Sequence, residues 1–274
     1  MIRKPRLPSR LYNALILLFL YAPIFVLIVF SFNSTKSRSV WTGFTLNWYK
    51  ELFSDSSIMN SFYTTIMVSV LSAIVATIAG TFAAVGFFNM RRRWRTPLMS
   101  INNIPLINAD IVTGVSMCLL FVSIGSVLKF NLGFATLLIA HITFNIPYVI
   151  LSIMPKLHQL DDNLVDAARD LGCTWMQAFR KVIIPEIMPG IVNGMIIAFT
   201  MSIDDFVISY FTAGSNTMTL SMSIFSMTRM RVSPKINALS TLLFLSVLIL
   251  LLIINLREIR QEDKLKKSAA ALKK

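Results

Sequence analysis

The sequence is poor in charge, and poorest in acidic charge. Only 14% of its 274 residues are charged, and 13 Asp and Glu stand against 26 Lys and Arg. A soluble domain has about 25% charged residues. With 55% hydrophobic residues and a mean hydropathy of +0.68, the composition excludes an ordinary soluble protein and indicates that lipid is the main solvent.

Residues that bind metals or form disulfides are also scarce. The chain has two cysteines, Cys118 and Cys173, and two histidines, His141 and His158, and neither pair has the spacing of a metal site or a disulfide. The G-x-x-x-x-G-K-[ST] and G-x-S-x-G patterns are missing, as is any Ser-His-Asp arrangement. We therefore expect no catalytic residues, no metal and no cofactor, and we do not expect an enzyme.

Long hydrophobic runs take the place of the missing charge. About 20 apolar residues span the ~30 Å hydrocarbon core of a bilayer, so we expect an all-α integral membrane protein with six transmembrane helices. The runs are residues 11–32, 61–90, 98–125, 133–154, 188–212 and 236–256. The first follows a basic stretch but lacks a small-x-small cleavage site, so we expect an uncleaved membrane helix and not a signal peptide.

The basic residues alternate between loops. Four Lys or Arg precede the first run, four separate the second from the third, four separate the fourth from the fifth, and seven follow the sixth, whereas the other loops share seven. Cytoplasmic loops carry such an excess, so we expect both termini in the cytoplasm. The net charge of +13 is then a topology signal, and nucleic acid is not an expected partner.

The loop 156–189 has a helical pattern of its own. Two capping boxes open two short helices; they are formed by Asn163 with Asp166 and by Thr174 with Gln177. Gly172 supplies a left-handed residue between the helices, and we expect Pro185 to end the second one.

An apolar stripe at helical spacing follows both short helices. It consists of Leu164, Ala168, Leu171, Trp175, Ala178 and Val182. A loop with such a stripe lies on the membrane surface, packs on its own helix ends or docks into another protein. The stripe leaves these three alternatives open.

The same loop resembles a known family. The stretch DAARDLGCTWMQAFRKVIIP is similar to the EAA loop of bacterial ABC-importer permeases, and the resemblance implies that it couples the chain to a cytoplasmic ATPase. The matching positions are Asp166, Ala167, Ala168, Gly172, Val182, Ile184 and Pro185. The departures from the family pattern, Asp for Glu, Val for Ile and Ile for Leu, are conservative.

Other segments resemble the second permease subunit of spermidine/putrescine importers. They are GFTLNWYKELF (43–53), ADIVTGVSMCLLF (109–121), HITFNIPYVI (141–150), FTMSIDDFVISYFTAG (199–214) and VSPKINALST (232–241). Lys235 departs from the acidic residue that we expect there in this subfamily. The resemblance implies the type I importer permease fold in a bacterial cytoplasmic (inner) membrane.

The resemblance also implies partners and an organisation of the chain. The expected partners are a homologous permease, two ATPase subunits and an extracellular or periplasmic polyamine-binding protein, besides the lipid bilayer. We expect residues 1–60 to form the first membrane helix and an outer aromatic loop, residues 61–256 the transport core with the coupling loop 156–189, and residues 257–274 a basic cytoplasmic tail.

Three acidic residues, Asp110, Asp204 and Asp205, lie inside hydrophobic runs. Ionisable groups at membrane depth usually face a protein interior or an aqueous path. At 1.5 Å per residue we expect Asp204 about 22 Å, and Asp110 about 18 Å, along their helices, with His141 near the same level. Neighbouring helical residues point about 100° apart. We therefore expect one of the adjacent pair to face the pathway and the other to bond the partner permease or cap a break.

The residues around these acids suit an amine. Carboxylates accept charge-assisted hydrogen bonds from ammonium groups, and aromatic faces suit a cation and its methylene spacers. The predicted substrate-pathway residues are Asp110, Asp204, Asp205 and Tyr210. The alternative is that the acids join helices structurally, and we interpret His141 as a hydrogen-bonded packing residue.

The outer loop between the first two runs is rich in aromatic residues. Trp41, Trp48 and Tyr49 are the predicted contacts with the binding protein. The alternative is that this loop folds back onto the membrane interface, where Trp and Tyr are favoured.

These observations lead to one main hypothesis and two competitors. The main hypothesis is a permease subunit of an ATP-driven polyamine importer. The first competitor is a permease for another small organic cation or another solute. The second is a proton-coupled carrier, which the EAA-type loop disfavours because such a carrier has no need to dock an ATPase.

Overall fold

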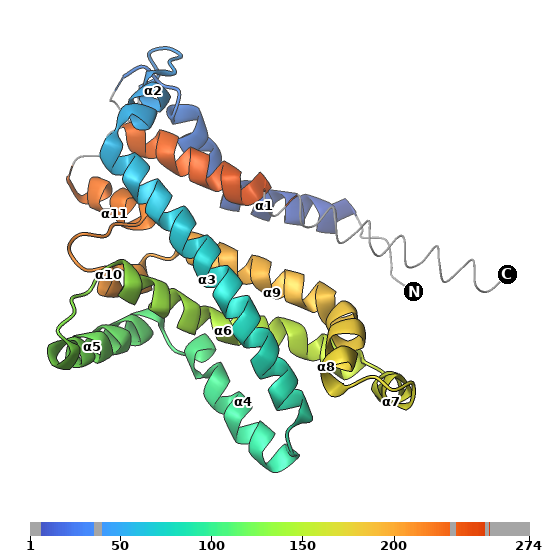
Figure 1. The fold of residues 1–274 in the computed structure, drawn as a ribbon. Helices are drawn as coiled ribbons and strands as arrows, with labels where there is room; N and C mark the ends of the chain where they lie inside the picture. The colour runs from blue at the N-terminus through green and yellow to red at the C-terminus, as the bar shows by residue number, and fades with distance from the viewer. Residues whose placement is uncertain (1–6, 36–39, 231–233, 250–251, 253–274) are drawn as a thin grey trace. The chain divides into compact units, whose positions relative to one another are not determined.

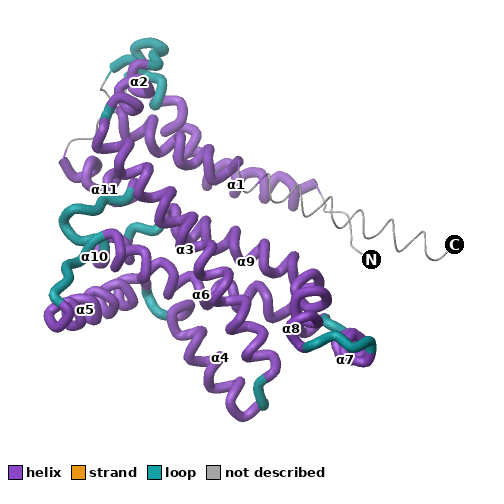
Figure 2. Tube along the Cα trace, viewed as in Figure 1, coloured by secondary structure: helices purple, strands orange, loops and turns teal. Residues whose placement is uncertain are grey.

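The computed structural model describes residues 7–35, 40–230, 234–249 and 252. The basic tail predicted for residues 257–274 and the end of the sixth run lie outside these residues. Where the chain is described, its regular structure is helical (Figure 2), apart from an antiparallel bridge between Asn33 and Phe44.

The helices of the described residues are shown in Figure 1. They are α1 (Leu7–Phe30), α2 (Asn47–Ser54), α3 (Ser56–Asn89), α4 (Arg92–Ile107), α5 (Asp110–Leu128), α6 (Phe134–Gln159), α7 (Asp162–Asp170), α8 (Trp175–Ala178), a π-helical turn (Phe179–Ile183), α9 (Ile184–Asp204), α10 (Val207–Thr212), α11 (Leu220–Met230) and a helix at Pro234–Ile249.

Five helical segments among the described residues are long and apolar enough to cross a membrane. They are Leu11–Phe30, Ser56–Asn89, Asp110–Leu128, Phe134–Gln159 and Trp175–Asp204. The helix at Pro234–Ile249, within the sixth predicted run, is apolar but shorter over the described residues. The prediction of an all-helical membrane protein is therefore confirmed at this level.

The chain divides into two compact units, Met1–Met59 with Ile224–Lys274, and Asn60–Ser223. The second unit contains the coupling loop and all three intramembrane acids. Its core lies where α6 packs against α9 and α3 (Figure 1), around Val149 and Ile153. Small residues permit this packing: a Cβ added at Gly194 would lie 3.2 Å from the Cα of Val149.

The third predicted run is not one helix. It is divided between α4 and α5, because Asn108 and Ala109 adopt extended backbone with ψ of 149° and 136°. Asp110 then lies in the first turn of α5, where a carboxylate interacts favourably with the helix dipole. Our estimate that Asp110 lies about 18 Å along a continuous helix is therefore wrong.

The fifth predicted run is also interrupted, at its outer end. The helix α9 ends at Asp204, Asp205 is extended with ψ of 128°, and α10 begins at Val207. At the opposite end, Pro185 does not end the preceding helix. The helical path continues from α8 through the π-helical turn into α9, and Pro185 lies in the first turn of α9, directly after this irregular turn.

Candidate functional site

The adjacent acids Asp204 and Asp205 lie at the break between α9 and α10 but have different surroundings. The Asp205 carboxylate accepts hydrogen bonds from the backbone N–H of Ile208 at 3.3 Å and of Ser209 at 2.8 Å, and from the Ser209 hydroxyl at 2.8 Å. It thereby caps the free N–H groups at the start of α10. Capping a break was one of the two alternatives for the acid that does not face the pathway.

Asp204, by contrast, is exposed at the last residue of α9. Tyr210 is 57% exposed, and its ring contacts Phe206 and Phe211, with centroids 5.6 and 5.5 Å apart. The second unit thus presents an exposed carboxylate on one side of the break and exposed aromatic surface on the other.

Asp110 belongs to a neighbouring part of the same unit. It is exposed at the start of α5 and lies close enough to Tyr148 of α6 for electrostatic interaction. The helix α5 packs on α10 at Gly114, where an added Cβ would lie 3.0 Å from the ring of Phe211. Asp110 of α5, Tyr148 of α6 and the aromatic residues of α10 therefore belong to one compact unit. Tyr148 was not predicted from the sequence.

His141 is fully buried on α6 and joins the two helices at the break. Its Nδ1 lies 2.5 Å from the Ser202 hydroxyl on α9, and its Nε2 lies 3.0 Å from the Ser209 hydroxyl on α10. Neither serine was predicted from the sequence, although Ser209 follows Asp205 by four residues, the spacing that would bring their side chains together on a continuous helix.

The coupling loop differs from its prediction at one cap and agrees at the other. The side chain of Asp161, and not of Asn163, caps α7 by accepting a hydrogen bond from the backbone N–H of Asn163 at 3.0 Å. The predicted capping box of Thr174 and Gln177 is confirmed. Gly172 is left-handed, with φ of +84°, as predicted.

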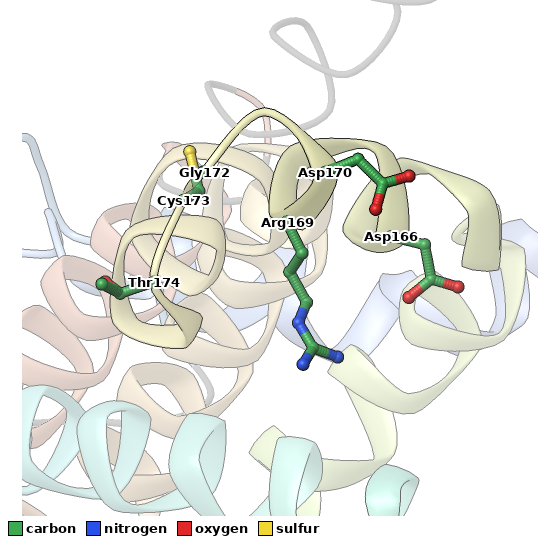
Figure 3. A pocket seen from close by; sticks show the side chains of 6 residues that line it. All are labelled: Asp166, Arg169, Asp170, Gly172, Cys173 and Thr174. Carbon is green, nitrogen blue, oxygen red and sulfur yellow. The ribbon is translucent and has the colours of Figure 1, made fainter.

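An open hollow lies at the turn between α7 and α8 (Figure 3). Its lining residues are Asp166, Arg169, Asp170, Gly172, Cys173 and Thr174. The side chains of Asp166 and Arg169 extend from α7 on the same side of the ribbon. The hollow thus presents charges of both signs beside the turn.

The apolar stripe of the coupling loop is only partly covered. Ala168 and Ala178 are buried, and Val182 is half-buried. Leu171 is 86% exposed and Trp175 is 53% exposed. The stripe therefore packs on its own unit at some positions and leaves a large apolar surface uncovered beside the turn at Gly172.

The residues that match the EAA pattern fall into two groups. Asp166, Ala167, Gly172 and Pro185 are exposed, whereas Ala168 is buried and Val182 and Ile184 are half-buried. The exposed members surround the turn and the start of α9, and the others pack inward.

The outer aromatic residues do not form one exposed cluster. Trp48 is 8% exposed and donates from Nε1 to the carbonyl of Asn33 at 2.7 Å, and the Tyr49 hydroxyl lies 2.7 Å from that of Ser31. The prediction that Trp48 offers docking surface is therefore wrong, because its indole N–H is occupied inside the first unit. Trp41 is exposed.

Among the residues that the structure describes, no group of three or more His, Cys, Asp and Glu is arranged to hold a metal ion. The same residues include both cysteines, Cys118 and Cys173, which are free thiols.

Comparison with known sequences identifies clear relatives. The family described as "Binding-protein-dependent transport system inner membrane component" matches residues 76–258. The putrescine transport system permease protein PotI of Escherichia coli (strain K12) is 40% identical over 228 residues, 82% of this chain and 81% of that protein. The spermidine/putrescine transport system permease protein PotC of Haemophilus influenzae is 34% identical over 235 residues, 86% of this chain and 90% of that protein.

Comparison with solved structures agrees with the fold. A bacterial ABC transporter involved in the import of the acidic polysaccharide alginate superposes with a TM-score of 0.68 at 15% identity, covering 91% of this chain and 97% of that chain. The inward-facing MetNI methionine ABC transporter superposes with a TM-score of 0.62 at 20% identity, covering 74% of this chain and 95% of that chain. At these identities the similarity shows the fold alone.

Proposed function

Because the chain belongs to the family of inner-membrane components of binding-protein-dependent transport systems, we propose that it is the permease subunit of an ATP-driven importer of polyamines such as spermidine and putrescine. The relatives named for these amines cover most of the chain. In this proposal the subunit has six transmembrane helices and cytoplasmic termini, and it pairs with a homologous permease.

The observation that carries the substrate assignment is the exposed carboxylate at the α9–α10 break. Asp204 lies across the break from the exposed ring of Tyr210, and the exposed Asp110 lies on α5. Polyamines carry ammonium groups separated by methylenes, so charge-assisted hydrogen bonds to Asp204 and Asp110 and contact with the Tyr210 face suit them. Asp205 has a supporting role, since its oxygens accept bonds from α10.

The coupling loop is the part of the chain that we assign to contact with the ATPase subunit. In this proposal the exposed Leu171 and Trp175 enter a groove of the ATPase subunit, where burial of apolar surface stabilises the contact by about 25 cal/mol per Å². The left-handed Gly172 sets the bend between α7 and α8. One such loop on each of two permeases accounts for two ATPase subunits. ATP binding then moves this loop, and α9, which continues from α8, transmits the movement to the break.

On the outer side, we assign the docking of the polyamine-binding protein to the exposed Trp41. Tyr49, half-buried in the same unit with its ring against Phe32 at a centroid distance of 5.3 Å, is the second contact that we assign to the binding protein. Truncation of Trp41 is therefore expected to weaken the binding protein's affinity for the complex.

The direct test is uptake of labelled spermidine and putrescine into proteoliposomes that contain the whole complex with its binding protein. We expect uptake of at least one amine that requires ATP and persists when an ionophore collapses the proton gradient. ATP-driven uptake of a different solute but neither amine would refute the polyamine assignment. Uptake driven by the proton gradient without ATP would instead support the carrier.

A further inference from the structure

A buried run of polar side chains joins four helices around His141. Its Nδ1 lies 2.5 Å from the Ser202 hydroxyl, and its Nε2 lies 3.0 Å from the Ser209 hydroxyl. Ser202 continues the run to the hydroxyl of Ser72 on α3, 3.1 Å away. All four side chains are buried, and a buried polar group is costly unless it is hydrogen-bonded. Their hydrogens must therefore be arranged consistently.

The hydroxyl of Ser209 determines the direction of these bonds. It has a single hydrogen, which it donates to Oδ2 of Asp205 over 2.8 Å. Its oxygen is therefore an acceptor toward His141, so Nε2 must carry a hydrogen and donate it. Without that hydrogen, the Nε2 lone pair would face both the Ser209 oxygen and the Asp205 carboxylate, which lies 3.5 Å from Nε2.

The other ring nitrogen then accepts. In a neutral imidazole one nitrogen donates and the other accepts, so Nδ1 receives the hydrogen of Ser202. The Ser202 oxygen in turn faces the hydroxyl of Ser72. Ser72 donates to the carbonyl of Ser69 at 3.3 Å and accepts a hydrogen bond from the Asn145 amide at 3.4 Å. From Ser202 through His141 and Ser209 the donors thus align toward Asp205, and aligned hydrogen bonds strengthen one another.

We propose that His141 is a positioning residue for transport. Through its Nε2 hydrogen it holds Ser209 and Asp205 in the geometry that caps α10, which maintains the α9–α10 break and leaves Asp204 exposed. This inference depends on the proposed function only where it gives Asp204 a role in transport. The arrangement of the break follows from the hydrogen bonds alone.

Two substitutions of similar polarity separate positioning from packing. The amide nitrogen of His141→Gln reaches the place of Nε2, whereas that of His141→Asn reaches only the place of Nδ1. The number of amine molecules transported per ATP hydrolysed is measured for each variant in the reconstituted complex. We expect Gln to keep this ratio within about twofold and Asn to lower it at least about fivefold, as loss of one buried hydrogen bond would.

A second measurement does not depend on the substrate. In a complex with Cys118→Ser and Cys173→Ser, the rate at which a charged methanethiosulfonate reagent labels Asp204→Cys reports the exposure of that position. We expect this rate to be unchanged by His141→Gln and to fall several-fold with His141→Asn.

The outcomes are distinguishable. The proposal would be overturned if His141→Gln and His141→Asn gave the same transport per ATP and the same labelling rate. It would also be overturned if the substitutions lowered only the yield of assembled complex and left transport per ATP unchanged. Either result would describe a residue that only packs. If the wild-type complex moves no amine, the proposed substrate is wrong, and the labelling rates still decide the role of His141.

Discussion

Two neighbouring carboxylates, Asp204 and Asp205, occupy different environments although both interrupt the same hydrophobic run. Asp205 accepts three hydrogen bonds from the first turn of α10, whereas Asp204 is exposed. Their chemistry is identical, so the difference in role comes from the backbone break, which directs one side chain inward to α10 and the other outward.

This difference predicts separate effects on stability. Asp205→Ala leaves the N–H groups of Ile208 and Ser209 without their acceptor, so we expect it to lower the free energy of unfolding by about 1–3 kcal/mol. Asp204→Ala, at an exposed position, is expected to change it by less than about 0.5 kcal/mol. Denaturant unfolding of the purified complex in detergent measures both. Equal losses would contradict the structural distinction.

At this scale the sequence predicted one of two local caps and none of the distant pairs. The Thr174–Gln177 box was predicted because both partners lie within one helical turn. The burial of Trp48 was not, because its indole N–H bonds to the carbonyl of Asn33, fifteen residues earlier. The partners of His141 lie on α9 and α10, and no spacing along the chain indicates which buried hydroxyls a fold brings together.

At the scale of the element, hydropathy located the helices but not their interruptions. The runs at 98–125 and 188–212 are apolar enough for single helices, yet each is broken. Hydropathy does not register that Asp110 favours a helix start or that Asp205 can cap a new helix. The continuity of α8 with α9 was missed for a related reason: proline usually ends a helix, but here a π-helical turn precedes Pro185 and the helical path continues.

The turn of the coupling loop gives a prediction about an element. Gly172 has φ of +84° and no atom within 4 Å of an added Cβ, so alanine there meets backbone strain without a steric clash. We expect Gly172→Ala to destabilise the left-handed conformation of the bend by about 1–2 kcal/mol. Co-purification of the ATPase and ATP-driven uptake should then fall together.

Gly86→Ala is the matched control, since a Cβ there also meets nothing within 4 Å and Gly86 lies inside α3. It is expected to leave both measurements unchanged. If Gly172→Ala retained full ATPase binding and uptake, the left-handed turn would not be what shapes the docking surface.

At the scale of the whole molecule, the distribution of basic residues predicts the topology. In cysteine-free protein, we expect a membrane-impermeant thiol reagent added outside intact cells to label Trp41→Cys but not Arg93→Cys. Inverted vesicles should give the reverse, because Arg93 belongs to a basic loop that the positive-inside rule assigns to the cytoplasm. Labelling of both from one side would contradict the proposed orientation.

The central claim is that the exposed carboxylate at the α9–α10 break carries the cation. The most direct measurement is spermidine moved per ATP hydrolysed by the reconstituted complex, for the wild type, Asp204→Asn and the charge-retaining Asp204→Glu. The account predicts at least about a tenfold loss for Asn, the factor expected when a charged hydrogen bond worth about 1.4 kcal/mol or more is removed, with ATP hydrolysis maintained and substantial activity for Glu. Transport by Asp204→Asn at the wild-type ratio would contradict it and make the carboxylate a structural group.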